Sequence, residues 1–184
     1  MPLTIPVILG SVRTDRIGNR AAQFLIAQLE ARGHAAPLVD PAELKLPLLD
    51  RMYKEYPAGT APEPLQRLAD LFRGSDAFLV VTAEYNHGVP PALSNTLDHF
   101  LEEYFWRPSA ICCYSAGQFG GVRAAMALRA MLARWACPAS PRSCRSRGSR
   151  KPSTARAFLP SPGSRRRPTA SSTNSNGTPR PCGT

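Results

Sequence analysis

The chain alternates between short apolar runs and longer segments in which apolar residues recur every three or four positions. Runs typical of buried strands occupy residues 5–9, 36–40, 76–82 and 110–114. Segments with helical spacing follow them at residues 22–29, 64–73, 91–101 and 122–132. Pro37 favours an edge position for the second strand. The alternation of strands and helices predicts a doubly wound α/β fold with a parallel sheet and right-handed crossovers.

Polar, glycine-bearing loops follow three of the four strands. We define them as the first loop (residues 10–19), the second loop (83–90) and the third loop (115–121). The carboxyl ends of parallel strands lie at the same edge of a sheet, so these loops are expected to meet there. The first loop runs from a buried strand into a helix, an arrangement that favours a bound anion. The pattern therefore predicts a phosphate-binding site completed by two further loops.

Composition is consistent with one globular domain. The chain has 184 residues, enough to bury a sizeable core, and no apolar run of the length that a membrane helix needs. We find no secretory signal pattern, and Cys112 and Cys113 lie inside an apolar run as expected for buried thiols. The three His residues do not cluster and no C-x-x-C occurs, so no metal site is expected. We expect a cytoplasmic protein without a membrane partner.

The net charge of +10 is confined to the C-terminal part of the chain. Residues 134–184 contain ten Arg and one Lys without Asp or Glu, whereas residues 1–133 carry a net charge of −1. This Arg/Ser/Pro-rich tail has too few apolar residues to offset the entropy of folding, so we expect it to be disordered. The expected domain is 1–133, and the fifth strand and last helix of the sheet are expected to be lost or corrupted.

A frameshift explains the tail. When GC-rich codons for the tail are translated one nucleotide out of phase, LGMPSIPSLVPIPRVQEAFDG appears from Trp135 onward. The same phase gives DRFLDELEWYAEALRD near the end, an acidic amphipathic helix. We infer a one-base loss near the codon for Arg134. The alternative is a genuine basic tail that binds nucleic acid.

The three loops together resemble the NADPH-dependent FMN reductase family. The matching segments are GSVRTDRIGN, TAEYNHGVPPALSNTLD and SAGQFGGVRA. The resemblance implies a flavodoxin-like sheet of order 2-1-3-4-5. Two departures stand out: Ala83 occupies a position where the family usually has Pro, and Ile17 and Gly18 stand where it often has Ser. Dinucleotide (G-x-G-x-x-G) and P-loop (G-x-x-x-x-G-K-[ST]) spacings are absent, and Asp40 is interpreted as a cap or turn residue.

The resemblance also implies which residues hold the flavin. Cofactor-binding residues are expected at Ser11, Arg13, Gly18, Asn19, Glu84, Tyr85, Asn86, His87, Gly88, Ser115, Gly117, Gly120 and Gly121. The first loop would hold the FMN phosphate, and the other two would edge the isoalloxazine. No catalytic side chain is assigned, because the flavin carries the hydride chemistry; His87 is given a positional role.

The implied function is an oxidoreductase that passes hydride from NADPH or NADH to FMN and then to a small-molecule acceptor. Flavins, quinones, azo compounds and metal oxyanions remain open as acceptors. The family resemblance implies a homodimer or homotetramer, with the aromatic segment Tyr104-Phe105-Trp106 as a candidate contact. The alternatives, which we do not favour, are nucleic-acid binding through the basic tail and an inactive frameshifted product.

Overall fold

A computed structural model describes residues 1–135 and 144–147. The strands are β1 (Val7–Leu9), β2 (Leu38–Val39), β3 (Phe78–Ala83), β4 (Ser109–Ser115) and β5 (Cys144–Arg147). The α-helices are α1 (Gly18–Glu30), α2 (Pro41–Leu44), α3 (Glu63–Arg73), α4 (Pro91–Asp98) and α5 (Val122–Arg134). Short 3-10 helices occupy Tyr53–Glu55 and Glu102–Tyr104. These elements follow the predicted alternation, with small shifts at their ends and two unpredicted short helices in the long loop after β2.

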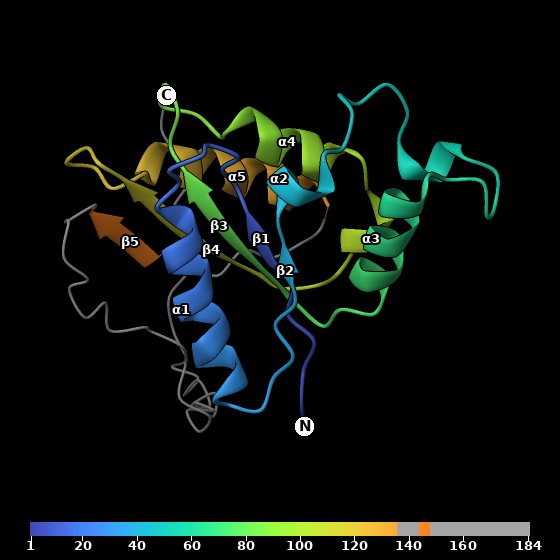
Figure 1. Cartoon of the computed structure of the whole chain (residues 1–184), viewed down its shortest axis with the longest axis horizontal. Coiled ribbons are helices and arrows are strands. Elements are labelled where there is room, and N and C mark those ends of the chain that lie inside the picture. Colours follow the sequence, from blue (N-terminus) through green and yellow to red (C-terminus); the bar gives the residue numbers. More distant parts are fainter. Residues whose placement is uncertain (136–143, 148–184) are drawn as a thin grey trace, which may run out of the picture.

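The strands form one parallel sheet of order β2-β1-β3-β4-β5. This order is that of the flavodoxin-like fold, so the predicted fold class is confirmed. Figure 1 shows the sheet with α1 on one face and α3, α4 and α5 on the other. Since successive side chains of a strand point to opposite faces, Val7 and Leu9 pack toward α1 whereas Ile8 packs toward the other helices.

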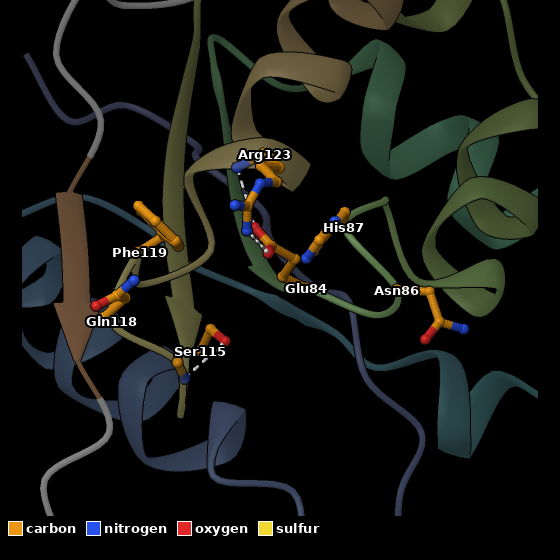
Figure 2. Close-up of a pocket in the computed structure, with 8 residues that line it drawn as sticks. Glu84, Asn86, His87, Ser115, Gln118, Phe119 and Arg123 are labelled. Carbon is orange, nitrogen blue, oxygen red and sulfur yellow. Dashed lines mark hydrogen bonds and ion pairs between the residues drawn. The ribbon is translucent and has the colours of Figure 1, made fainter.

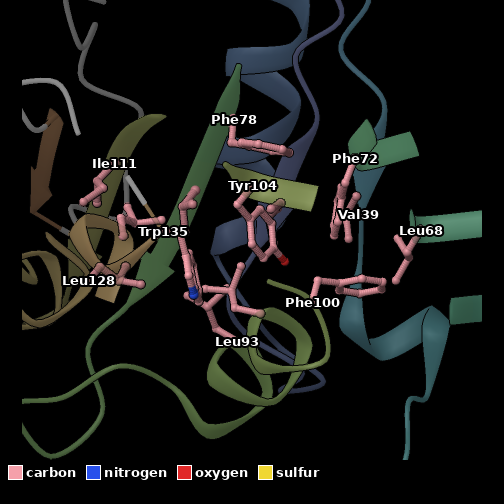
Figure 3. Packing of buried hydrophobic residues seen from close by; sticks show 14 of the residues in the cluster. Val39, Leu68, Phe72, Phe78, Leu93, Phe100, Tyr104, Ile111, Leu128 and Trp135 are labelled. Atoms are coloured by element: carbon pink, nitrogen blue, oxygen red, sulfur yellow. The ribbon is translucent and has the colours of Figure 1, made fainter. Parts of the chain in front are cut away.

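The larger core lies on the face covered by α3, α4 and α5. Its centre is a group of aromatic rings (Figure 3), in which Phe72 makes edge contacts with Phe78 and Phe100 at centroid distances of 5.6 and 5.1 Å. Tyr104 stacks on Trp135 at 4.6 Å, and Trp135 is buried. Trp135, two residues past the predicted boundary at 133, is therefore part of this core.

The structure corrects one prediction. We expected the fifth strand to be lost or corrupted; it is not lost, because Cys144–Arg147 pairs in parallel with β4, in the register Cys112↔Cys144 to Ser115↔Arg147. The sequence CRSR has no apolar run, so its strand was not recognised. Strand pairing uses backbone N–H and C=O groups, and the edge of β4 offers these to any segment that reaches it. The last helix and most of the tail expected to be disordered lie outside the described residues.

One further feature matches expectation. Cys112 and Cys113 are both buried in β4. Across the described part of the chain, none of the helices has the length and apolar character needed to cross a membrane.

Candidate functional site

The first loop leaves β1 at the carboxyl edge of the sheet and is held by Ser11. This residue is 2 % exposed, and its hydroxyl oxygen lies 2.6 Å from the hydroxyl of Tyr85 in the second loop. The backbone N–H of Arg13 donates to the same Ser11 oxygen at 3.4 Å. The side chain of Arg13 is exposed beside this buried hydroxyl. Two predicted phosphate ligands and one predicted flavin contact are therefore brought together.

The start of α1 is open to an anion. Its N-cap residue, Ile17, makes no side-chain cap, and no acidic residue lies in the first turn. The first N–H groups of a helix lack intrahelical acceptors and carry the positive end of the helix dipole. Gly18 and Asn19 form this first turn, as predicted for a phosphate site.

Arg16, which was not predicted from the sequence, also lies at the first loop. Its Nε donates to Asn19 Oδ1 at 2.9 Å, and its guanidinium forms an ion pair with Asp40. Asp40 also caps α2, accepting from the backbone N–H of Ala42 at 2.9 Å, so its interpretation as a cap is confirmed. Because β2 and β1 are neighbours, an acid at the end of β2 lies beside the first loop; this adjacency was the available signal for Arg16.

The second loop turns tightly between Tyr85 and Gly88. Their backbone groups are joined by reciprocal hydrogen bonds of 3.1 and 2.9 Å. The two central residues, Asn86 and His87, have φ values of 48° and 64°, which define a type I′ turn. Figure 2 shows His87 directed toward Glu84 and Arg123, whereas Asn86 points away from them.

Glu84 joins the second loop to the start of α5. Its Oε2 accepts from the backbone N–H groups of Arg123 at 2.9 Å and Ala124 at 3.3 Å. Its Oε1 lies 3.5 Å from Nη1 of Arg123, and the carboxylate side chain is 7 % exposed. The negative charge thus satisfies two first-turn N–H groups of α5 and complements the helix dipole. In this structure Glu84 acts as a helix cap supplied by another loop.

The third loop approaches the sheet closely at its last glycine. Gly121 has φ 84°, and a Cβ there would lie 2.9 Å from the carbonyl oxygen of Tyr114. Gly120 also has a positive φ, of 59°. Near the start of the loop, the N–H of Gly117 donates to the hydroxyl of Ser115 at 3.2 Å. Glycine at 121 is therefore required by both backbone conformation and space.

A pocket of about 420 Å³ opens between the second and third loops (Figure 2). It is lined by Glu84, Asn86, His87, Ser115, Gly117, Gln118, Phe119 and Arg123. Five of these residues were predicted. None of the other predicted residues lines this pocket: four of them belong to the first loop, and the rest belong to the second and third loops.

The other three lining residues, Gln118, Phe119 and Arg123, were not predicted from the sequence. Phe119 is 44 % exposed, and the guanidinium carbon of Arg123 lies 4.4 Å from the centre of its ring. An aromatic residue in an otherwise polar glycine-rich loop was the signal for Phe119. Arg123 was assigned to the following helix, and its ion pair with Glu84 could not be foreseen from sequence spacing.

Tyr114, near the end of β4, lies beneath the end of the first loop, against Gly18. Burial, reinforced by the nearby Tyr85, raises the pKa of Tyr114 to about 12, although the Ser11 hydroxyl and the Arg16 charge oppose the rise. The phenol is therefore neutral at physiological pH. Its position under Gly18 places one more hydroxyl near the start of α1.

The described residues contain no cluster of His, Cys, Asp or Glu that could hold a metal ion. The groups present instead suit a flavin mononucleotide. The open helix start, the arginines and the hydroxyls of the first loop suit a dianionic phosphate. Gly117 and the turn residues Asn86 and His87 are among the residues that line the neighbouring pocket, where a flat ring could lie. Fold and site together define a flavodoxin-like flavoprotein.

Comparison with known proteins gives the family. A profile of the NADPH-dependent FMN reductases matches residues 3–145, and the chain belongs to this family. It is 33% identical over 134 residues to a quinone reductase of Pseudomonas putida, covering 70% of this chain and 69% of that protein. It is 33% identical over 138 residues to a 2-hydroxy-1,4-benzoquinone reductase of Burkholderia sp, covering 72% of each.

A solved structure agrees. The flavoenzyme NAD(P)H:(acceptor) oxidoreductase FerB from Paracoccus denitrificans superposes with a TM-score of 0.63 at 25% identity, covering 77% of this chain and 78% of that one. The protein is therefore an oxidoreductase with FMN as cofactor and NAD(P)H as reductant. None of these relatives supports the nucleic-acid alternative.

Proposed function

We propose that this chain transfers reducing equivalents from NAD(P)H to a quinone. The observation that carries the proposal is the open pocket between the second and third loops, beside a first loop suited to phosphate. Two relatives that each share about 70% of their length with the chain are named as reductases of quinones. Flavins, azo compounds and metal oxyanions are the competing acceptor classes.

The phosphate end of FMN is assigned to the first loop. Ser11, Arg13 and Asn19 would hold the phosphate together with the N–H groups of the first turn of α1. Arg16 joins them, since its guanidinium already lies beside Asn19. The ion pair with Asp40 orients the Arg16 guanidinium before the anion arrives. A bound phosphate would then compete with Asp40 for this guanidinium.

The ring end is assigned to the second and third loops. The turn at Asn86 and His87 and the glycines at 117, 120 and 121 would edge the isoalloxazine with backbone groups. Backbone N–H groups aimed at a site of developing negative charge stabilise it without reorganisation. Glu84 would act indirectly, since its carboxylate is committed to the start of α5.

When bound, FMN supplies the ability to accept a hydride from NAD(P)H and to release two electrons to an acceptor. In the balanced reaction NAD(P)H becomes NAD(P)⁺, and a quinone gains two electrons and two protons, one of them from solvent, to become a hydroquinone. The exposed ring of Phe119 offers a flat apolar surface for a planar acceptor at the pocket. The exposed His87 is well placed to position this acceptor.

The test is a comparison of acceptors. The purified chain, loaded with FMN, is supplied with NADPH and either a benzoquinone, free FMN, an azo dye or chromate. The proposal expects the highest kcat/KM with the quinone. A higher value with any other class would replace the quinone as acceptor.

We further propose that the protein acts in the cytoplasm as a homodimer or homotetramer. In the aromatic segment that we predicted as a subunit contact, Tyr104 is buried in the core, whereas Trp106 is 82% exposed. Trp106 also has φ 64°, a conformation that a bulky residue rarely adopts without a reason. Sedimentation analysis of the unmodified chain and of Trp106→Ser tests the oligomer and this contact: a monomer for both would contradict it.

For the tail, we propose the one-base loss near the codon for Arg134. The family profile ends at residue 145, shortly after that point. The basic tail would then be a by-product of the shift and the packed domain the functional unit. Resequencing of the locus tests this directly, and an unshifted sequence would reject it.

A further inference from the structure

The hydroxyl of Tyr114 is buried directly beneath the first residue of α1. A Cβ on Gly18 would lie 2.3 Å from this hydroxyl oxygen and 2.9 Å from the ring carbon that bears it. Any side chain at position 18 would therefore displace the phenol. The glycine at the start of α1 is explained by Tyr114, which reaches the first loop from β4.

This hydroxyl has no hydrogen-bond partner of acceptable geometry within residues 1–135 and 144–147. Its neighbour Ser11 is already engaged, because its oxygen bonds the Tyr85 hydroxyl at 2.6 Å and receives the Arg13 N–H at 3.4 Å. A hydroxyl oxygen has two lone pairs and one proton. In the Ser11–Tyr85 pair either hydroxyl can be the donor, and the two hydrogen bonds of the Ser11 oxygen go to Tyr85 and Arg13, not to Tyr114.

The Tyr114 hydroxyl is therefore a donor in need of an acceptor. It remains protonated throughout the physiological range, since the pKa of the phenol is raised to about 12. Leaving a buried polar group unsatisfied is unfavourable, and an incoming acceptor at this place removes the penalty. The first loop itself carries two hydroxyl side chains, Ser11, which is buried, and Thr14, which is exposed.

We propose that Tyr114 is a ligand of the flavin phosphate and donates its hydroxyl proton to a phosphate oxygen held at the start of α1. The inference rests on the proposed FMN site. Where the family often has Ser, this chain has Ile17 and Gly18, whose side chains cannot donate a hydrogen bond to a phosphate. The proposal assigns this contact to Tyr114 of β4 instead. Gly18 and Tyr114 then act together, because the absence of a side chain at position 18 leaves space for the phenol to reach the anion.

The test compares two flavins that differ in the phosphate. Binding of FMN and of riboflavin to the full chain and to Tyr114→Phe is measured by flavin fluorescence quenching. Loss of a hydrogen bond to a charged group predicts that FMN binds about 10- to 100-fold more weakly to the variant. Riboflavin affinity is expected to change less than about twofold, since the lost partner is absent from riboflavin. Tyr53→Phe is the matched control, because the Tyr53 hydroxyl bonds Gln66 and its removal should leave both affinities unchanged.

The possible results separate clearly. Unchanged FMN affinity in Tyr114→Phe, or an equal loss for both flavins, overturns the proposal while the FMN site itself stands. Binding of neither flavin by the unmodified chain overturns the proposed function as well. Thermal unfolding without flavin gives a second check: Tyr114→Phe should be as stable as the unmodified chain or slightly more stable, since an unsatisfied hydroxyl is removed. A clear loss of stability would instead assign the phenol a structural role and reject the proposal.

Discussion

The hydroxyl oxygens of Ser11 and Tyr85 lie 2.6 Å apart and join the first loop to the second. One residue follows β1 and the other follows β3, which are neighbouring strands. The bond therefore ties the proposed phosphate end of the site to the proposed ring end before any ligand binds. Such preorganisation reduces the cost of binding.

Tyr85→Phe tests this link. The variant loses one neutral hydrogen bond, typically worth about 1 kcal/mol, so FMN should bind about three- to tenfold more weakly. Ser11→Ala should cost more, because it removes the link and a phosphate ligand together. The double variant should lose less than the sum of the single effects, as expected of residues in contact. Isothermal titration with FMN measures all three, and Tyr56→Phe is the control. Additive losses would show that the two hydroxyls act separately.

Glu84→Ala tests the cap on α5. It leaves two first-turn N–H groups without their acceptor and Arg123 without its carboxylate. The expected loss in the free energy of unfolding is about 2 kcal/mol, with a fall in Tm of about 5–10 °C. Glu84→Gln keeps one acceptor oxygen and should lose about half as much.

The matched control for this prediction is Glu63→Ala. Glu63 forms an exposed pair with Arg67, in which the two side chains are 68% and 77% exposed. Such pairs contribute about 0.5 kcal/mol or less. Thermal unfolding followed by circular dichroism compares the variants. Equal effects of Glu84→Ala and Glu63→Ala would contradict the capping role.

Gly121→Ala tests the close approach of the third loop to β4. Both Gly121 and Gly33 have φ near +80°, so Ala at either position pays about 1–2 kcal/mol for the left-handed conformation. A Cβ at 121 would also meet the Tyr114 carbonyl oxygen at 2.9 Å, whereas a Cβ at 33 would meet nothing within 4 Å. Gly121→Ala should therefore destabilise clearly more than Gly33→Ala in chemical denaturation. Equal losses in the free energy of unfolding would show that the third loop can shift to accommodate a Cβ at position 121.

Alkaline pH tests the environment of Tyr114. Its pKa is about 12 in the folded chain, above the ordinary value of 10.0, mainly because burial disfavours the phenolate. The folded state then holds this proton more tightly than the unfolded state does, so stability is full below about pH 10 and falls as the pH rises toward 12. Tyr114→Phe should lose less stability than the unmodified chain between pH 9.5 and 11.5 (about the range in which the two states differ). Parallel curves of Tm against pH would contradict the assigned pKa.

Much of the fold followed from the sequence because its signals are local. The apolar run before Ala83 and the helical spacing after Val122 indicated β3 and α5, and Gly74 ends α3 as predicted. The family resemblance implied a fifth strand beside β4, but its position at Cys144–Arg147 was not located, because this pairing uses the backbone of the β4 edge and the sequence CRSR carries no strand pattern.

The site divides in the same way. Loops that follow parallel strands were expected to meet, and the link between Ser11 and Tyr85 shows that two of them do. Phe119 was missed although it lies within a predicted loop. Arg16 and Arg123 were missed because their ion-pair partners, Asp40 and Glu84, are distant in sequence. The same holds for the unit formed by Gly18 and Tyr114, which are 96 positions apart and in contact only after folding.

Titration of FMN with the purified 184-residue chain tests the central claim most directly. The account predicts saturable quenching of flavin fluorescence with one FMN per chain, a yellow protein after desalting, and NADPH oxidation by the complex. A frame-restored chain, measured in parallel, should bind FMN at least as tightly because its C-terminal segment would then match that of the family. A colourless protein that quenches no FMN in both forms would contradict the assignment of the three loops to a flavin.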